Sequence, residues 1–231
     1  MIVFNGTALE SVAPVMIEDI RISPISLGVT ARERPVRFGA DFVRMTGGSR
    51  TVAITFSVLT ENREARTRQL QAITDWARTE AEGILKLPDL PERYLNCICT
   101  GLPEPSARQW WESKLRLVFS TVSDPYWNDI EEKHEACGTA FTVLGSAPPR
   151  MQIRYTNPSS GGLIYSDGTD TITLGSVGAG NLMIDLNHQT IQLGSSSIMN
   201  QYSFGSSFIQ PRTGNITITG SGNVYWRERW Q

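Results

Sequence analysis

Apolar side chains alternate with small or polar ones along residues 51–59, where every second position is apolar: Val52, Ile54, Phe56 and Val58. Because successive side chains of a strand point to opposite faces of a sheet, this alternation predicts a half-buried strand. Residues 115–120 alternate as well but are partly apolar at both parities, which predicts a more central strand.

Between these strands the spacing of apolar residues changes from two to three and four. In residues 62–81 the repeat is formed by Leu70, Ile73, Ala77 and Ala81, with Trp76 beside it. This spacing predicts an amphipathic helix. Asn62 is the expected N-cap, and Gly83 is expected to end the helix in a left-handed conformation.

Shorter apolar runs predict further strands, at residues 15–22, 84–88 and 92–100, with prolines at or near their ends. Residues 37–45 and the strand after Arg50 have the pattern of a hairpin, whose turn would use Gly47 and Gly48 at positive φ. The first part of the chain is therefore expected to be an α+β domain, with one helix covering a mostly antiparallel sheet.

The composition changes near residue 147, after which charged residues are sparse and Gly, Ser, Thr and Asn are frequent. The stretch 145–149, Gly-Ser-Ala-Pro-Pro, resembles a linker. Seven or more short strands follow without helical periodicity, which predicts a small all-β sandwich or barrel. We therefore expect two domains, 1–147 and 148–231.

The charge pattern disfavours nucleic acid and membrane as partners. The net charge is −2, 18 of the 21 basic residues are Arg, and no long run of like charge occurs, so sequence-specific DNA binding is not expected. The local excess of Arg between Arg21 and Arg50 fits a solvated face or an interface. No apolar run reaches membrane-spanning length and no signal peptide is evident, so the chain is expected to stay in the cytoplasm where it is made.

Candidate catalytic and metal-binding residues do not form a recognisable pattern. The three cysteines are Cys97, Cys99 and Cys137, an odd number, and the two histidines fall in different expected domains. No nucleophile elbow, zinc-protease motif or phosphate loop is present, and the glycine-rich stretch 175–180 is followed by a strand. We expect no enzyme activity, no cofactor and no metal.

Aromatic residues leave two alternatives open. Trp110 and Trp111 cannot both point into one core if their segment is extended, so one of them faces a partner or folds over its own loop. In the second domain, Tyr225 is expected outside and Trp226 inside. Aromatic residues there could also form a platform for a sugar.

The order of several short motifs resembles the distal tail protein (Dit) family of long, flexible-tailed bacteriophages. The resemblance covers about residues 20 to 128 and is carried by Arg37-Phe38-Gly39-Ala40-Asp41-Phe42, Gly48-Ser49-Arg50-Thr51-Val52-Ala53-Ile54-Thr55-Phe56, Arg66 with Leu70, Ile73 and Trp76, Arg93-Tyr94, Val118-Phe119 and Asp124-Pro125-Tyr126-Trp127. The second domain is similar, more loosely, to the family's galectin-like or carbohydrate-module-like sandwich.

This resemblance implies a structural hub at the tip of a phage, prophage or gene-transfer-agent tail. Members form a six-membered ring between the tail tube and the tail-associated fibre or baseplate proteins, and DNA passes through the ring. The alternative function is a carbohydrate-binding adhesin that acts through the second domain. The residues expected at the subunit or partner interface are Arg37, Asp41, Gly47, Gly48, Arg50, Trp110 and Trp111.

Overall fold

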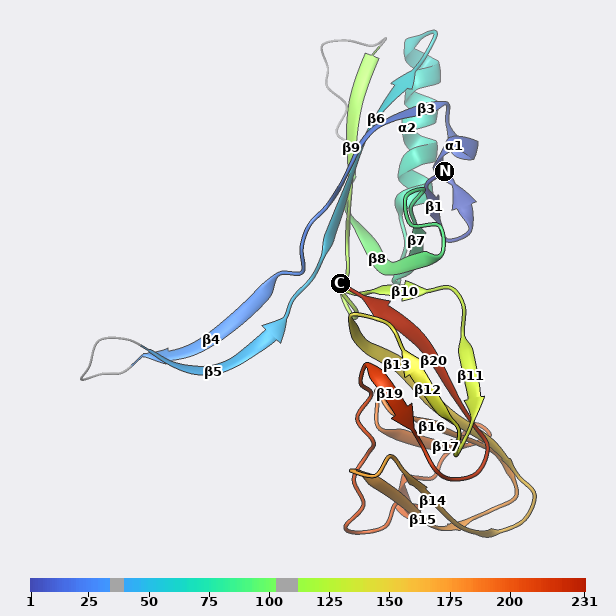
Figure 1. Ribbon diagram of the computed structural model, residues 1–231. Helices are drawn as coiled ribbons and strands as arrows, with labels where there is room; N and C mark the ends of the chain where they lie inside the picture. The colour runs from blue at the N-terminus through green and yellow to red at the C-terminus, as the bar shows by residue number, and fades with distance from the viewer. Residues whose placement is uncertain (34–39, 103–111) are drawn as a thin grey trace. The chain divides into compact units, whose positions relative to one another are not determined.

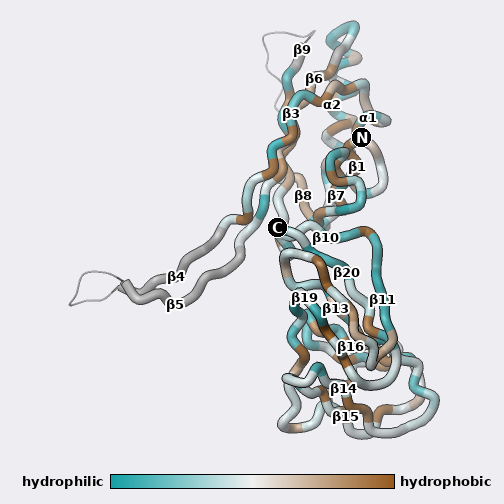
Figure 2. The backbone as a smooth tube through the Cα atoms, in the orientation of Figure 1, coloured by the Kyte–Doolittle hydropathy of each residue, from teal (hydrophilic) through white to brown (hydrophobic). Residues whose placement is uncertain are grey.

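The chain is mostly antiparallel β-structure with few helices (Figure 1). The structure is a computed structural model and describes residues 1–33, 40–102 and 112–231. Contacts within the chain divide it into two compact units, Met1–Trp127 with the terminal Gln231, and Asn128–Trp230. Strand β10 (Trp127–Asp129) lies where the two units join in the sequence. Apolar positions recur along the strands of both units (Figure 2).

The first unit is built on one antiparallel sheet in the order β3–β6–β9–β8–β7–β1–β2. A separate pair of strands, β4 and β5, belongs to the same unit. The elements of this unit are β1 (Val3–Phe4), β2 (Thr7–Ala8), α1 (Leu9–Val12), β3 (Val15–Ile22), β4 (Leu27–Glu33), β5 (Ala40–Gly47), β6 (Thr51–Leu59), α2 (Arg63–Ala77), β7 (Gly83–Lys86), β8 (Arg93–Gly101) and β9 (Glu112–Ser120).

The alternating apolar residues of β6 and β9 face each other across the sheet. The register pairs Val52 with Phe119, Ile54 with Leu117 and Phe56 with Leu115. All six side chains are 0–1% exposed. The two strands predicted from periodicity are therefore confirmed, and their apolar faces form the centre of this unit's core.

Helix α2 begins where the sequence predicts and ends earlier. The side chain of Asn62 accepts a hydrogen bond from the backbone N–H of Ala65 at 2.8 Å, which confirms the predicted N-cap. The helix ends at Ala77, and the prediction that Gly83 ends it is wrong, because Gly83 is the first residue of β7. A Cβ atom at Gly83 would lie 2.5 Å from Asn5 Oδ1, so close packing excludes a side chain there.

Three aromatic rings join α2 to the sheet. Trp76 packs edge-on against Phe4 and Phe119, with ring centroids 5.8 and 6.2 Å apart, and Phe4 and Phe119 are 5.0 Å apart. The indole N–H of Trp76 donates to the carbonyl oxygen of Thr7 at 3.0 Å. The helix thus covers the sheet as predicted, and its one large aromatic residue has both an apolar contact and a polar partner.

The second unit contains a six-stranded antiparallel sheet in the order β18–β17–β16–β13–β20–β11. Two further pairs, β12–β19 and β14–β15, complete it. Its elements are β11 (Lys133–Ala136), β12 (Ala140–Val143), β13 (Ala147–Asn157), β14 (Gly161–Ser166), β15 (Thr171–Val177), β16 (Gly180–Asp185), β17 (Thr190–Leu193), β18 (Ser196–Ser197), the 3₁₀ turn η1 (Met199–Gln201), β19 (Gly214–Thr217) and β20 (Asn223–Trp230).

One buried cluster joins the sheet to the two strand pairs. It combines Ile153 and Val224 from the sheet with Tyr165 and Ile172 from β14–β15 and with residues of β12–β19. Phe141 of β12 stacks on Trp226 of β20 at 4.3 Å between ring centroids. Trp226 is 5% exposed, while Tyr225 is half-buried, so the alternation predicted for β20 is confirmed.

A hairpin turn joins β16 to β17 between residues 186 and 190. Asp185 ends β16, and its Oδ1 accepts the backbone N–H groups of Asn187 at 3.0 Å and His188 at 2.9 Å. Gln189 has φ 55°, the left-handed conformation that such turns require. The carboxylate therefore fixes the turn through the N–H groups it binds.

The stretch 145–149 is not a linker. Ala147, Pro148 and Pro149 belong to β13, and the ladder to β20 is irregular between Ala147 and Arg150. Proline has no N–H to donate, so it fits such an irregular position. Strands β11 and β12 precede residue 147 but pair with β20 and β19. The second unit thus includes β11 and β12, which lie before the boundary expected at residue 147.

Candidate subunit interface

Strands β4 and β5 form a two-stranded antiparallel hairpin, which we call the arm (residues 27–47). Its register runs from Leu27 opposite Gly47 to Glu33 opposite Ala40, with a shift between Thr30 and Ala31. Among the strands of the described chain, neither β4 nor β5 has a second partner. Each therefore presents an outer edge of backbone N–H and C=O groups.

The predicted hairpin between β5 and β6 is wrong. Strand β5 pairs with β4, while β6 pairs with β3 and β9. Gly48 does not have a positive φ. A Cβ atom there would instead lie 2.6 Å from the carbonyl oxygen of Ser26, so the glycine allows two backbone segments to approach closely.

A group of hydroxyl residues ties the base of the arm to the main sheet. The N–H of Ser26 donates to Ser49 O at 3.0 Å, and its hydroxyl donates to the same oxygen at 2.9 Å. The N–H of Gly48 donates to Ser26 O at 2.6 Å. Next along the ladder, Ser23 N–H donates to Thr51 O at 2.9 Å, and the Ser23 hydroxyl accepts the Thr51 N–H at 2.8 Å. Hydrogen bonds from backbone and hydroxyl groups thus link the two segments that lie between the β3–β6 ladder and the arm.

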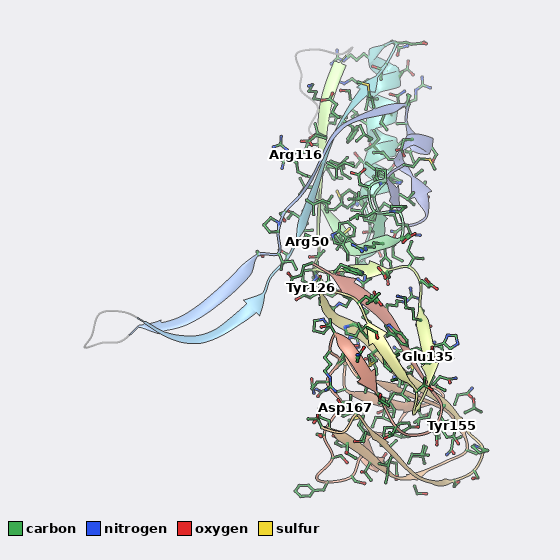
Figure 3. All side chains as sticks on the ribbon, viewed as in Figure 1. Arg50, Arg116, Tyr126, Glu135, Tyr155 and Asp167 are labelled. Carbon is green, nitrogen blue, oxygen red and sulfur yellow. The ribbon has the colours of Figure 1, made fainter. Side chains whose placement is uncertain are left out.

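Arg50 lies at this base and is buried. Its N–H donates to Thr121 Oγ1 at 2.8 Å, and Thr121 N–H donates back to Arg50 O at 3.0 Å. The side chain is 4% exposed, and burial lowers the pKa of Arg50 while the neighbouring Tyr126 opposes that shift. Figure 3 labels both residues near the base of the arm. Arg50 therefore supports the arm from inside and is not available at its surface.

Of the other predicted interface residues, only some lie in the part of the chain that the structure describes. Asp41 is in β5 opposite Arg32, and Gly47 ends that strand opposite Leu27. Arg37, Trp110 and Trp111 lie outside the described residues. Sequence reasoning missed β4, which supplies half of the arm. Leu27, Val29 and Ala31 do occupy every second position there, so this short alternation is the signal that could have identified the strand.

Strand β3 is the longer of the two edge strands of the main sheet, the other being the two-residue β2. Within the described chain it pairs only with β6, and the register shifts between Ile17 and Asp19. Because Ser23 N–H points to β6, the alternation of an antiparallel ladder directs the N–H of Ile22 away from it. The Ile22 side chain is 42% exposed. Pro14 and Pro24 flank this strand, and such prolines mark either the ends of a strand or an edge strand.

Strand β3 also carries a carboxylate that is held within its own sheet. Glu18 accepts hydrogen bonds from the Ser57 hydroxyl and from Lys114 Nζ, the latter at 3.0 Å. These two bonds lower the pKa of Glu18. The charge of Glu18 is therefore matched within the sheet, by Ser57 of β6 and Lys114 of β9.

The Asp-Pro-Tyr-Trp stretch closes the first unit through carboxylate contacts with backbone groups. Asp124 Oδ1 accepts the N–H of Tyr126 at 3.2 Å, and Asp124 is 3% exposed. Glu82 accepts the N–H groups of Val122 at 3.0 Å and Ser123 at 2.8 Å. The Glu82 carboxylate is therefore bound to backbone groups of its own chain.

The described residues contain no metal-binding cluster, and their most buried thiols are unreactive. No three His, Cys, Asp or Glu side chains converge there so as to hold a metal ion. Burial raises the pKa of Cys97 to about 12 and that of Cys137 to about 11, so both thiols stay protonated at neutral pH. Within the same residues, no helix is long and apolar enough to cross a membrane.

The helix-backed sheet, the arm and the all-antiparallel second unit define a strand-rich class of protein with a free hairpin and a free sheet edge among its described strands. Solved structures with a similar fold are known. The chain is similar to the Dit protein (gp 19.1) of SPP1, described as a paradigm of the hub adsorption apparatus in phages that infect Gram-positive bacteria. The TM-score is 0.83 at 15% identity, covering 100% of this chain and 98% of that one. The chain therefore has the fold of this Dit protein.

Two chains from structures of the phage p2 baseplate in its activated conformation, with Ca and with Sr, have TM-scores of 0.49 and 0.47 at 9% and 8% identity. Each match covers 94% of this chain and 90% of the other. Similarity this low supports no further conclusion. No family model matches the sequence, and no curated protein has significant sequence similarity to it.

Proposed function

We propose that this protein is a structural distal tail protein. Six copies form a ring at the tip of a phage-like tail, assembled in the host cytoplasm, that joins the tail tube to tail-associated fibre or baseplate proteins and surrounds the DNA channel. The observation that carries the proposal is the full-length fold likeness to the SPP1 Dit protein. The second unit then corresponds to the galectin-like or carbohydrate-module-like sandwich of that architecture, and the chain catalyses no reaction.

Ring assembly requires two different surfaces on each copy, because a head-to-tail contact uses one patch on each side. The arm is one such surface, with two free edges seven and eight residues long. The eight-residue edge of β3 is the other. An extended segment can add to an open sheet edge through backbone hydrogen bonds, so the arm of one copy extends the sheet of the next.

The fixed base of the arm gives this contact a defined direction. A ring closes only if the angle between neighbours is constant, and an arm joined by flexible residues would allow open chains as well. The hydrogen bonds at Ser23, Ser26 and Gly48 restrict the arm at its origin. In this proposal Arg37, Asp41, Trp110 and Trp111 contribute side chains to the contact, and Gly47, Gly48 and Arg50 set the base.

The proposal is tested with two variants that each remove one surface. The first replaces residues 27–47 with a short Gly-Ser turn. The second is Ile22→Pro, which removes an outward N–H while leaving the inward ladder to β6 in place; Ile22→Val is its control. Native mass spectrometry at increasing protein concentration measures the assemblies.

We expect the wild type and I22V to form hexamers and both edge variants to be monomers. A mixture of the two variants gives the more specific test, because the arm-deleted chain retains the β3 edge and I22P retains the arm. It is expected to give one-to-one dimers and nothing larger. Equal assembly by the arm-deleted chain, or a wild type that remains monomeric throughout, would overturn the proposal.

A further inference from the structure

Strand β15 pairs with β14 on one side, and a segment that is not a strand covers its other side. This segment consists of residues 201–207, which we call the cap. One isolated bridge, between Tyr202 and Leu174, marks its start. There Gln201 Oε1 also accepts the N–H of Ser176 at 3.2 Å. The cap occupies the place that a further strand of this pair would take.

Backbone groups of the cap bind the carbonyl oxygens on this side of β15. The N–H of Ser203 donates to Thr173 O at 2.9 Å, and the N–H of Ser207 donates to Thr171 O at 2.8 Å. These two carbonyl groups belong to residues two positions apart, which is the interval at which a strand directs its backbone groups to the same neighbour. They are therefore the acceptors that an added strand would use.

Serine hydroxyls of the cap accept the N–H groups on the same side of β15. The N–H of Thr173 donates to Ser206 Oγ at 3.1 Å, and the N–H of Thr171 donates to Ser207 Oγ at 3.3 Å. In an ordinary ladder, backbone carbonyl oxygens of the next strand would accept these bonds. Here side-chain oxygens replace them, so the edge of β15 is satisfied without a regular partner strand.

A tight turn interrupts the cap. The N–H of Ser206 donates to Ser203 O at 3.2 Å across Phe204 and Gly205, and Gly205 has φ 84°. A residue at positive φ in the third position fits a type II turn. Phe204, in the second position, is fully exposed. The cap therefore binds β15 on one side and has a turn in place of an extended backbone, so it does not continue the sheet.

Packing and an ion pair hold the loop that carries the cap. The rings of Tyr202 and Phe208 stack with centroids 4.9 Å apart, which closes the loop at its two ends. Ile209, the next residue, is 1% exposed and belongs to the buried cluster of this unit. Arg212 Nη1 lies 2.7 Å from Asp167 Oδ2, between β14 and β15. The serine residues of the cap are therefore held next to the edge that they bind.

The sequence of β15 indicates what the cap prevents. Its seven residues, Thr-Ile-Thr-Leu-Gly-Ser-Val, include no charge and no proline and are rich in β-branched side chains. An uncovered edge of this kind is a template for pairing with another chain. Two copies of β15 can pair antiparallel about a two-fold axis, which places threonines of the two copies opposite each other.

We propose that the cap is an autoinhibitory contact that keeps β15 from pairing with the β15 strand of a second copy. Loss of the cap converts the second unit into a self-associating one. A second copy is the partner that fits, because the edge is uncharged and complementary to itself in the antiparallel direction. The proposal does not depend on ring formation, since the cap and the strand belong to one unit of one chain.

The first test measures whether the hydroxyl groups protect the edge. The double variant Ser206→Ala with Ser207→Ala removes both acceptors, and hydrogen exchange mass spectrometry follows the peptides that cover β15. Exchange of the outward amides is expected to become about tenfold faster, the upper end of what one neutral hydrogen bond contributes. Ser159→Ala with Ser160→Ala, an exposed pair of serines outside the cap, is the matched control and is expected to exchange like the wild type.

The second test removes the cap. Residues 203–207 are replaced by Gly-Gly in the I22P chain, in which the β3 edge is not expected to contribute to association. Analytical ultracentrifugation is expected to show dimers whose fraction rises with concentration, while I22P with its cap stays monomeric. Exchange at β15 is expected to slow as the dimers form, which locates the contact. Adding Thr173→Lys places like charges across the two-fold axis and is expected to restore the monomer.

Circular dichroism checks that each variant is folded, and the exchange rates of the double serine variant decide the question even if the shortened chain does not fold. The proposal is overturned if that variant exchanges like its control. It is also overturned if the folded chain without the cap stays monomeric, or if it associates without protection of β15. A wild type that is monomeric would overturn the ring and leave both of these measurements unchanged.

Discussion

The ion pair between Lys133 and Glu228 gives a quantitative test of how the second unit is held together. Lys133 Nζ lies 2.8 Å from Glu228 Oε1, and the same oxygen accepts the N–H of Leu144 at 3.2 Å. The Glu228 side chain is 2% exposed and that of Lys133 is 34% exposed. The carboxylate thus links β11, β20 and the residue after β12 while having little access to water.

Lys133→Met removes the cation and leaves a buried carboxylate with one backbone donor. Breaking a fully buried pair costs about 3–5 kcal/mol; since Lys133 is partly exposed, we expect a loss of about 2–3 kcal/mol in the free energy of unfolding. Adding Glu228→Gln removes the unmatched charge and retains an acceptor for Leu144. The double variant is therefore expected to be about 1–2 kcal/mol more stable than K133M alone.

Urea unfolding followed by tryptophan fluorescence and far-ultraviolet circular dichroism measures these changes. Lys114→Met is the control, because the Lys114–Glu18 pair is exposed at 68% and 22% and is expected to contribute no more than about 0.5–1 kcal/mol. Two results would refute the reasoning: a K133M variant within about 0.5 kcal/mol of the wild type, or a double variant less stable than K133M.

Three further predictions concern single residues. Tyr165→Phe removes a buried hydroxyl without a partner in the described chain and is expected to raise the free energy of unfolding by about 1 kcal/mol in urea; a loss would contradict this. Burial raises the pKa of Asp185, but the hydrogen bonds that its carboxylate accepts outweigh this effect, so the pKa is lowered overall. The ionised carboxylate therefore stabilises the fold above about pH 4, and this stabilisation is lost as the pH falls. Asp185→Asn is expected to reduce the loss of unfolding free energy between pH 7 and pH 2, measured by urea unfolding at each pH. Gly48→Ala forces a Cβ against Ser26 and is expected to cost about 1–3 kcal/mol in urea unfolding, whereas Gly161→Ala, with open space around it, should be near neutral.

Features set by local periodicity could be predicted from the sequence. The strand at Val52, the helix capped by Asn62 and the alternation around Trp226 each depend on side chains two to four positions apart. Burial then follows directly, since an apolar stripe on a strand or helix must face a core. The ends of these elements are less well determined by periodicity, and the helix ends at Ala77 rather than before Gly83.

Features set by pairing between distant segments could not be predicted in this way. The glycines at positions 47 and 48 favour a local hairpin turn, but β5 pairs with β4 and the glycine at 48 is needed for close packing on Ser26. Likewise, Arg154, Asn181 and Asn223 each look like part of an ordinary solvated strand face in the sequence. Only the register of β13, β16 and β20 brings Arg154, Asn181 and Asn223 together.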